Sequence, residues 1–237
     1  MQITIDGRQV EAKEGRTVLQ VARQNGIHIP TLCYHEALQP FGACRLCVVE
    51  IETSRGRRLV TSCTHPCSEG LAVHTASDAV LQSRRITVEL LMASAEHVPL
   101  IQQLANELGV KEPRFTMPEN TCVLCGLCVR ACNEIVGVGA ISVINRGIDK
   151  EVSPPFHIAS NACIACGTCV LICPTGAITL ADINGGAETA HKWDSAFQAV
   201  SCRMCGHHSL QPVFADHIKL LTVDEATATI PAGEAVS

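Results

Sequence analysis

The most constraining feature of the sequence is a run of four cysteines that occurs twice. In both copies the gaps between successive cysteines are two, two and three residues, and a glycine follows the second cysteine. A segment containing Gly-Ala-Ile comes after each copy. The repeat therefore predicts two similar halves, each with four thiols close together. The cysteines are Cys122, Cys125, Cys128 and Cys132 in the first copy, and Cys163, Cys166, Cys169 and Cys173 in the second.

The spacing within each run is that of the cysteine ligands of a [4Fe–4S] cluster. In ferredoxins with two such clusters, the fourth cysteine of each run binds the other cluster. Pro174 follows Cys173 as this motif expects, whereas Asn133 stands in place of a proline after Cys132. We therefore expect a pseudo-symmetric fold that resembles a bacterial ferredoxin. The predicted ligands are Cys122, Cys125, Cys128 and Cys173 for one cluster, and Cys163, Cys166, Cys169 and Cys132 for the other.

The high cysteine content allows two interpretations, a disulfide framework or a set of metal ligands. The chain has 15 cysteines in 237 residues. Its first residues, MQITIDGRQVEAKEGRTV, lack the basic segment and apolar core of a secretion signal, and disulfide frameworks are typical of secreted chains. No stretch reaches the roughly 18 apolar residues that a membrane-spanning helix needs. We therefore expect a cytoplasmic chain without a membrane span, whose thiols bind metal.

Charge, aromatic content and motifs exclude other classes of function. The net charge is −5 and aromatic residues make up 3% of the chain, so neither a basic surface nor a base-stacking surface for nucleic acid is expected. The sequence contains no G-x-G-x-x-G fingerprint and no P-loop. If nicotinamide or flavin takes part in the chemistry, another subunit is expected to bind it.

A second group of four cysteines lies near the N-terminus. Cys33, Cys44, Cys47 and Cys63 are separated by gaps of ten, two and fifteen residues. A [2Fe–2S] rhomb needs four thiolates, two on each iron, and a long loop followed by a distant fourth thiolate can supply them. Gly42 and the alanine after it are small, which allows backbone N–H groups to approach the sulfides. Cys67 lies four residues after Cys63 and is an alternative fourth ligand, although a small buried hydrophobe is the more ordinary role for it.

The residues around this group resemble a known family. The strings are IPTLCYH at residues 29–35, GACRLCVVE at residues 42–50 and TSCTHP at residues 61–66. They resemble the N-terminal ferredoxin domain of the large iron–sulfur subunit of respiratory complex I, the diaphorase subunits of NAD-coupled hydrogenases and the N-terminal part of iron-only hydrogenases. The resemblance covers nearly all of residues 1–78 and implies a β-grasp [2Fe–2S] domain with Cys63 as the fourth ligand.

Hydrophobic patterns and turn signals predict an α+β fold with four parts. Residues 1–78 read as the [2Fe–2S] domain, with strands near residues 3–5, 48–51, 59–60 and 71–73, a turn at Asp6-Gly7 and a helix capped by Thr17. Residues 79–117 read as a helical connector, with Asp78 as the N-cap of its first helix and Gly109 ending its second. Residues 118–182 form the ferredoxin with two [4Fe–4S] clusters. Residues 183–237 form a small C-terminal extension.

The C-terminal extension contains a weaker metal motif, Cys202-x-x-Cys205, with histidines close by in the sequence. Two cysteines beside histidines suit tetrahedral zinc. A reduced pair in a packed tail, half of a further iron–sulfur site and a redox-active dithiol are the alternatives. Relatives of this kind often carry an additional cluster with one histidine ligand after the first domain. Only His97 stands there in this chain, with no cysteine, so that cluster is expected to be missing.

Together the motifs predict a chain that carries electrons between one [2Fe–2S] and two [4Fe–4S] clusters and has no catalytic residues of its own. The resemblance implies a subunit of a soluble multi-subunit NAD(P)-coupled hydrogenase or formate dehydrogenase. Both electron-bifurcating and non-bifurcating enzymes of this kind fit. The expected partners are a flavin- and NAD(P)-binding diaphorase subunit and a catalytic metal subunit. A free-standing polyferredoxin is an alternative. So is the iron–sulfur subunit of a succinate dehydrogenase or fumarate reductase, whose first motif has a shorter gap.

Overall fold

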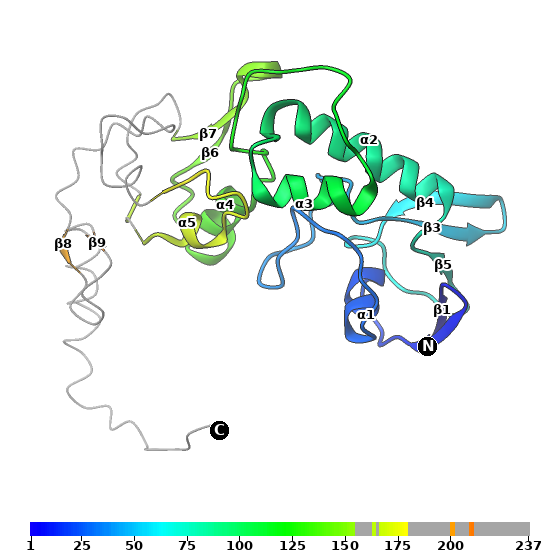
Figure 1. Ribbon diagram of the computed structural model, residues 1–237. Helices are drawn as coiled ribbons and strands as arrows, with labels where there is room; N and C mark the ends of the chain where they lie inside the picture. Colours follow the sequence, from blue (N-terminus) through cyan, green and yellow to red (C-terminus); the bar gives the residue numbers. More distant parts are fainter. Residues whose placement is uncertain (155–162, 165, 180–199, 202–208, 211–237) are drawn as a thin grey trace, which may run out of the picture.

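The computed structural model describes residues 1–154, 163–164, 166–179, 200–201 and 209–210. Figure 1 shows an N-terminal sheet at one end, the helices α2 (Asp78–Ala95) and α3 (Pro99–Leu108) in the middle, and the short elements of the cysteine runs at the other end. The mixed sheet and the separate helices agree with the predicted α+β class. In the described part of the chain, no helix is both long enough and apolar enough to cross a membrane.

The N-terminal part is a mixed five-stranded sheet with the strand order β2-β1-β5-β3-β4. The central pair β1 and β5 is parallel, and the other neighbours are antiparallel. Helix α1 (Val18–Gln24) follows the first hairpin. The strands are β1 (Gln2–Ile5), β2 (Arg8–Glu11), β3 (Val48–Thr53), β4 (Gly56–Thr61) and β5 (Ala72–His74).

Local sequence signals explain where these elements begin and end. Asp6 and Gly7 both have positive φ, +49° and +80°, which is the backbone of the tight hairpin turn that the Asp-Gly pair predicts. Thr17 and Gln20 form a capping box at the start of α1, each side chain bonding the other residue's backbone N–H. Both the predicted turn and the predicted cap are therefore confirmed.

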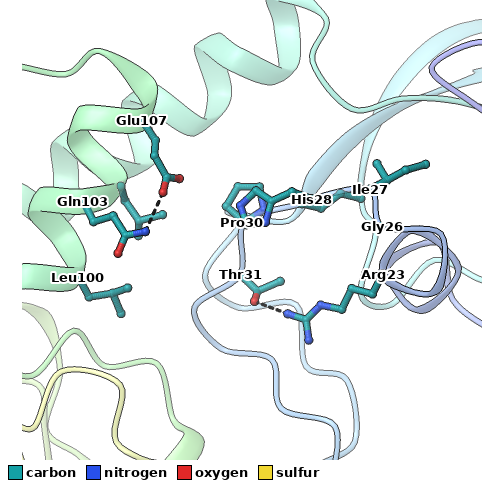
Figure 2. A pocket seen from close by; sticks show the side chains of 11 residues that line it. Arg23, Gly26, Ile27, His28, Pro30, Thr31, Leu100, Gln103 and Glu107 are labelled. Atoms are coloured by element: carbon teal, nitrogen blue, oxygen red, sulfur yellow. Dashed lines mark hydrogen bonds between the residues drawn. The ribbon is translucent and has the colours of Figure 1, made fainter.

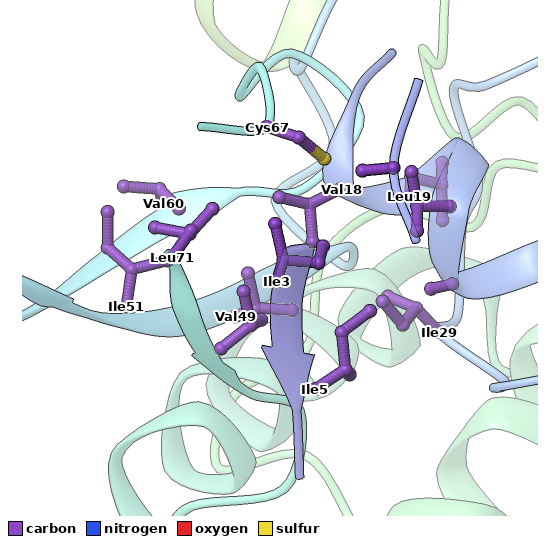
Figure 3. Close-up of a cluster of buried hydrophobic side chains, with 14 of the residues drawn as sticks. Ile3, Ile5, Val18, Leu19, Ile29, Val49, Ile51, Val60, Cys67 and Leu71 are labelled. Atoms are coloured by element: carbon purple, nitrogen blue, oxygen red, sulfur yellow. The ribbon is translucent and has the colours of Figure 1, made fainter. Parts of the chain in front are cut away.

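The core of the N-terminal part lies between α1 and the sheet (Figure 3). Ile3 and Ile5 of β1 pack there with the buried face of α1, whose Val18 and Leu19 are fully buried. Cys67 lies in the same core, its thiol directed toward Val18 in Figure 3. The alternation in β1 that predicts a half-buried strand thus places the two isoleucines against α1.

The connector is a helical hairpin, as predicted, but its first cap differs from the prediction. Ser77, not Asp78, is the N-cap of α2, and its hydroxyl accepts a hydrogen bond from Val80 N. Asp78 is the first helical residue, where its negative charge is favourable at the helix N-terminus. Helix α3 ends at Gly109, whose φ of +68° provides the left-handed C-cap that the sequence indicates.

The hairpin α2–α3 joins the flanking parts through a shared core. Val88 and Met92 of α2 and Ile101 of α3 are buried together with Leu32 and Leu46 from the N-terminal cysteine loops. The partly buried Val123 and Cys125, from the first cysteine run, also pack there. The connector therefore contacts the cysteine-bearing segments on both sides of it.

The described residues of the cysteine runs form short elements. Each run contains a short helix whose N-cap is a glycine. The two glycines have nearly the same backbone conformation, with φ 74° and ψ 7° at Gly126 and φ 72° and ψ 2° at Gly167. This similarity of backbone supports the internal repeat. The elements are α4 (Leu127–Arg130), the π-helical turn η1 (Ala131–Ile135), β6 (Ser142–Ile144), the 3-10 turn η2 (Gly147–Asp149), β7 (Glu151–Ser153), α5 (Thr168–Ile172), β8 (Val200–Ser201) and β9 (Ser209–Leu210).

Candidate iron–sulfur centres

The structure brings the four N-terminal cysteines together as two pairs. The backbone N–H of Cys44 donates to Cys33 Sγ at 3.4 Å, and the sulfurs of Cys47 and Cys63 lie 3.3 Å apart. Cys33, Cys47 and Cys63 are each 1% exposed. Two pairs of thiols fit the donor set of a [2Fe–2S] rhomb, which takes two thiolates on each iron.

Hydrogen bonding within each pair separates the acidities of its two thiols. The bond from Cys44 lowers the pKa of Cys33 to about 5, against burial, and backbone N–H groups and the Arg130 charge lower it further. The bond between Cys47 and Cys63 lowers the pKa of Cys47 to about 6. The same bonds, together with burial, raise the pKa of Cys44 and Cys63. In each pair the thiol with the lowered pKa favours the thiolate, which is the form that binds metal.

The loop around these thiols requires a glycine at position 42. Gly42 has φ +72°, and a Cβ there would lie 3.2 Å from Thr64 Cγ2 and 3.3 Å from Thr61 Oγ1. A side chain would therefore be strained in the backbone and crowded by two threonines. The small residue that the sequence analysis singled out is what allows this loop to pack against the segment that carries Cys63.

Two cysteines of the first run, Cys122 and Cys125, are affected by Cys173 from the second run. Burial raises the pKa of Cys122, and the charge of Cys173 adds to the rise. Burial, Cys173 and Cys122 likewise raise the pKa of Cys125 to about 11. Burial alone would raise the pKa of the Cys173 thiol. Hydrogen bonds from backbone N–H groups and from the Thr175 hydroxyl outweigh this effect and lower the pKa. These effects are the ones expected if Cys173 lies beside Cys122 and Cys125, as in the predicted crossed set.

The reciprocal arrangement holds for the second run. A hollow with mostly apolar walls is lined by the four cysteines of this set: Cys132, Cys163, Cys166 and Cys169. Burial and the charges of the other three cysteines raise the pKa of Cys169 to about 12. Ala140 N donates to Cys132 Sγ at 3.3 Å, a backbone contact of the kind that tunes iron–sulfur centres. The four thiols of the second predicted set therefore line one hollow.

The three groups of thiols follow one another in space. Cys44 of the N-terminal group and Cys125 of the first run pack against the same buried cluster. Cys128 of the first run is buried in another cluster, against which Cys132 and Cys169 pack. Among the described residues, no three ligand side chains converge on one metal-ion position. The thiols around a multi-iron cluster bind different iron atoms, so they do not need to meet at one position.

Other predicted sites stand apart from these groups. Burial alone raises the pKa of Cys67, which lies in the core between α1 and the sheet. His97 is exposed and hydrogen-bonds Thr121 Oγ1 at 3.0 Å. A pocket between α1 and α3 (Figure 2) contains the Arg23–Thr31 and Gln103–Glu107 hydrogen bonds but no cysteine. Cys202 and Cys205 lie outside the described residues.

Sequence reasoning missed two arginines beside the cysteine loops, Arg84, which is buried, and Arg130, which is partly buried. Arg84 is 5% exposed and donates to Leu46 O at 3.0 Å and to Val48 O at 2.7 Å, on either side of Cys47. Its position four residues from both Val80 and Val88, in the buried stripe of α2, is a sequence signal that could have identified it. Arg130 donates to Cys33 O at 3.3 Å across 97 positions, and no local pattern indicates that contact.

Comparison with known proteins identifies one 2Fe–2S and one 4Fe–4S domain in the chain. A profile described as "2Fe-2S iron-sulfur cluster binding domain" matches residues 1–78, and one described as "4Fe-4S binding domain" matches residues 156–179. A crystal structure of an NAD+-reducing [NiFe]-hydrogenase in the H2-reduced state contains a chain that superposes with a TM-score of 0.58. The two are 31% identical, over 65% of this chain and 74% of that one. The chain belongs to the family of iron–sulfur electron-transfer subunits shared by NAD(P)-coupled hydrogenases and NADH-quinone oxidoreductases.

Larger proteins of this family show the same relationship. One of the NADH-quinone oxidoreductase subunits of Rhizobium meliloti is 31% identical, over 87% of this chain and 27% of that protein. NADP-reducing hydrogenase subunit HndD of Solidesulfovibrio fructosivorans is 36% identical, over 74% of this chain and 35% of that protein. The chain thus spans about a third of the length of these curated relatives. Within the family it is an iron–sulfur electron-transfer protein with a 2Fe–2S and a 4Fe–4S ferredoxin domain.

Proposed function

We propose that the chain holds three clusters and relays electrons between a flavin- and NAD(P)-binding subunit and a catalytic metal subunit. The ligands are Cys33, Cys44, Cys47 and Cys63 for a [2Fe–2S] centre, Cys122, Cys125, Cys128 and Cys173 for one [4Fe–4S] centre, and Cys132, Cys163, Cys166 and Cys169 for the other. The observation that carries the proposal is the grouping of the thiols: Cys33 lies by Cys44 and Cys47 by Cys63, and one hollow is lined by Cys132, Cys163, Cys166 and Cys169.

The placement of the three sets supports a linear relay. Cys44 and Cys125 pack against one buried cluster and Cys128 and Cys169 belong to another, which supports a first [4Fe–4S] set between the other two. When bound, such clusters each accept and release single electrons, at potentials set by hydrogen bonds, charge and solvent exposure. The protein's part is to hold the thiolates, exclude water and supply those hydrogen bonds.

The parent enzyme is proposed from the relatives. One relative's name describes an NADP-reducing hydrogenase, and the superposed chain belongs to an NAD+-reducing [NiFe]-hydrogenase. An NAD(P)-coupled hydrogenase or formate dehydrogenase of the cytoplasm, with a diaphorase-type partner, is therefore the enzyme we propose. The sheet order and the crossed cysteine sets support a β-grasp domain followed by a ferredoxin with two clusters.

The test has two measurements. After anaerobic reconstitution, the chain alone is expected to hold about ten irons and to show a [2Fe–2S] signal together with two [4Fe–4S] signals on reduction. An iron content near six would remove one cubane from the proposal. Tagged chain captured from native cells is expected to bring a flavoprotein and a subunit with nickel, molybdenum, tungsten or further iron. Recovery of the chain as a monomer would instead support a free-standing carrier.

We also propose, as a separate site, zinc at Cys202 and Cys205. The support is the Cys-x-x-Cys spacing beside His207 and His208. Zinc analysis of the reconstituted chain, before and after replacement of both cysteines by serine, tests it. Loss of about one zinc per chain on replacement is the expected result.

A further inference from the structure

The loop between Cys33 and Cys44 contacts helix α4 and the turn η1, which carry Cys128 and Cys132 of the first cysteine run. Arg130 at the end of α4 donates from Nη1 to Cys33 O at 3.3 Å. Its guanidinium lies 5.3 Å from the centre of the Phe41 ring. Glu134, one turn later in η1, accepts from Gln39 N at 2.9 Å. The ten-residue gap, longer than in plant-type ferredoxins, thus provides the surface that meets the first cysteine run.

A small apolar contact supports the same junction. Leu38, from the middle of the loop, is buried together with Leu127 of α4 and Ala131 of η1. The partly buried Cys125 packs against this contact, so a predicted cluster ligand forms part of it. The hydrogen bonds of Arg130 and Glu134 therefore join the same two segments as this apolar contact, the loop after Cys33 and the first cysteine run.

Arg130 has hydrogen-bonding capacity that the described residues do not use. Its side chain is 12% exposed. The Nε and Nη2 atoms are buried and have no hydrogen-bond partner among the described residues. Nε lies 3.7 Å from Glu134 Oε1, an ion-pair distance beyond hydrogen-bonding range. Buried N–H groups of a guanidinium are costly unless an acceptor or a negative charge lies near them.

We propose that Arg130 and Glu134 form an electrostatic clamp that sets the reduction potential of the [2Fe–2S] centre and fixes it against the first [4Fe–4S] centre. Arg130 is in this view a tuning and positioning residue, and the inference rests on the ligands given under Proposed function. The clamp explains both the buried unpartnered N–H groups and the length of the loop.

The sign of the effect follows from charge. With its four thiolates, the [2Fe–2S] complex goes from −2 to −3 on accepting one electron, with no proton and no bond change. Arg130 is permanently protonated, so its positive charge stabilises the reduced complex more than the oxidised one. Glu134 acts in the opposite direction.

The test uses the full reconstituted chain and four variants. R130Q removes the positive charge, R130K keeps it but loses the planar fork, and E134Q removes the negative charge. R57Q is the matched control, because Arg57 is a 57%-exposed arginine that also pairs with glutamates. It lies at the start of β4, at the opposite end of the molecule from α4 and α5 (Figure 1). The readout is the midpoint potential of the [2Fe–2S] signal, titrated with dithionite and followed by electron paramagnetic resonance.

R130Q is expected to make reduction of the [2Fe–2S] centre about tenfold less favourable, which is about 59 mV for a one-electron couple. E134Q is expected to shift the potential in the opposite direction, and R130K by less than half of the R130Q shift. R57Q is expected to leave it unchanged. In R130Q the magnetic interaction between the reduced [2Fe–2S] and [4Fe–4S] centres is also expected to weaken.

An unchanged potential in R130Q, or a shift of the same size in R57Q, overturns the clamp. Equal shifts in R130K and R130Q overturn its electrostatic role and leave a packing contact. If R130Q does not fold, a potential in E134Q that fails to rise overturns the inference alone. A wild-type chain without a [2Fe–2S] signal refutes the proposed function itself, and is thereby distinguishable from failure of the clamp.

Discussion

At the scale of single residues, Cys63 and Cys67 offer a direct comparison of ligand and core residue. Cys63 pairs with Cys47, whereas Cys67 lies among the apolar side chains between α1 and the sheet. We expect Cys63→Ala to lose the [2Fe–2S] signal and about two irons per chain. We expect Cys67→Ala to keep both and to lower the free energy of unfolding by about 1 kcal/mol, as for other small core truncations. Iron analysis and spectroscopy of the two variants provide the measurement.

The matched pair also tests the assignment in reverse. If Cys67→Ala loses iron while Cys63→Ala retains it, the fourth ligand is Cys67, and the geometry described above does not represent the loaded protein. Both variants remove one thiol from neighbouring positions, so a general effect of cysteine loss on reconstitution would appear in both. The comparison therefore isolates the role of the position.

Ligand residues were the part of the site that sequence could predict, because their spacing is a local property. The runs of four cysteines and the string around Cys44 and Cys47 indicate which thiols meet, and the described residues bring them together. Arg130 and Arg84 were not predicted. Their contacts cross 97 and 38 positions of the chain, and such contacts depend on how whole elements pack.

At the scale of elements, helix α2 supports the [2Fe–2S] loop through Arg84. The guanidinium is the donor for two buried backbone carbonyls, and burial lowers its pKa while the Cys47 charge raises it. We expect R84M to leave both carbonyls without this donor and to lower the free energy of unfolding of the metal-free chain by about 2–5 kcal/mol. Urea unfolding at neutral pH measures the loss.

Arg85, the next residue on the same helix, is the control. It is exposed and donates to Leu108 O at 2.9 Å, so R85M is expected to cost less than about 1 kcal/mol. Equal losses in the two variants would show that Arg84 contributes no more than an ordinary helix contact. A large loss in R84M alone would support α2 as the structural backing of the cluster loop.

Helix boundaries and faces were predicted unequally well. Gly109 and the capping box at Thr17 act through their own backbone, so local rules identify them. The predicted N-cap of α2, Asp78, is one residue beyond the observed one, Ser77. Both residue types are good caps, and the tertiary packing of the helix decides between them. Ile86 and Leu90 are about half exposed, although the apolar pattern of the helix includes them.

At the scale of the whole molecule, the boundary predicted at residue 78 separates segments that share a core. Leu32 and Leu46 belong to the N-terminal part, yet they are buried with Val88, Met92 and Ile101 of the helical hairpin. Burying one leucine side chain stabilises a fold by about 1.5–3 kcal/mol. Exposing both would therefore cost about 3–6 kcal/mol, which is comparable to the total stability of a small domain.

Two fragments test this dependence. A fragment of residues 1–78 is expected to unfold at lower urea than a fragment of residues 1–117, and to lose its [2Fe–2S] centre more quickly in air, because Leu32, Leu46 and the partly buried Cys44 lose their cover. In the fragment of residues 1–78, Leu46 has lost its cover, so Leu46→Gln is expected to raise solubility but not the free energy of unfolding. In the fragment of residues 1–117, Leu46 is buried against the hairpin, so the same change is expected to lower the free energy of unfolding. Equal urea midpoints for the two fragments would show that the N-terminal part folds independently and that the hairpin is only a spacer. A lower midpoint for the shorter fragment would show that α2 and α3, which lead to the next centre, belong to the [2Fe–2S] domain and shield its buried residues from water.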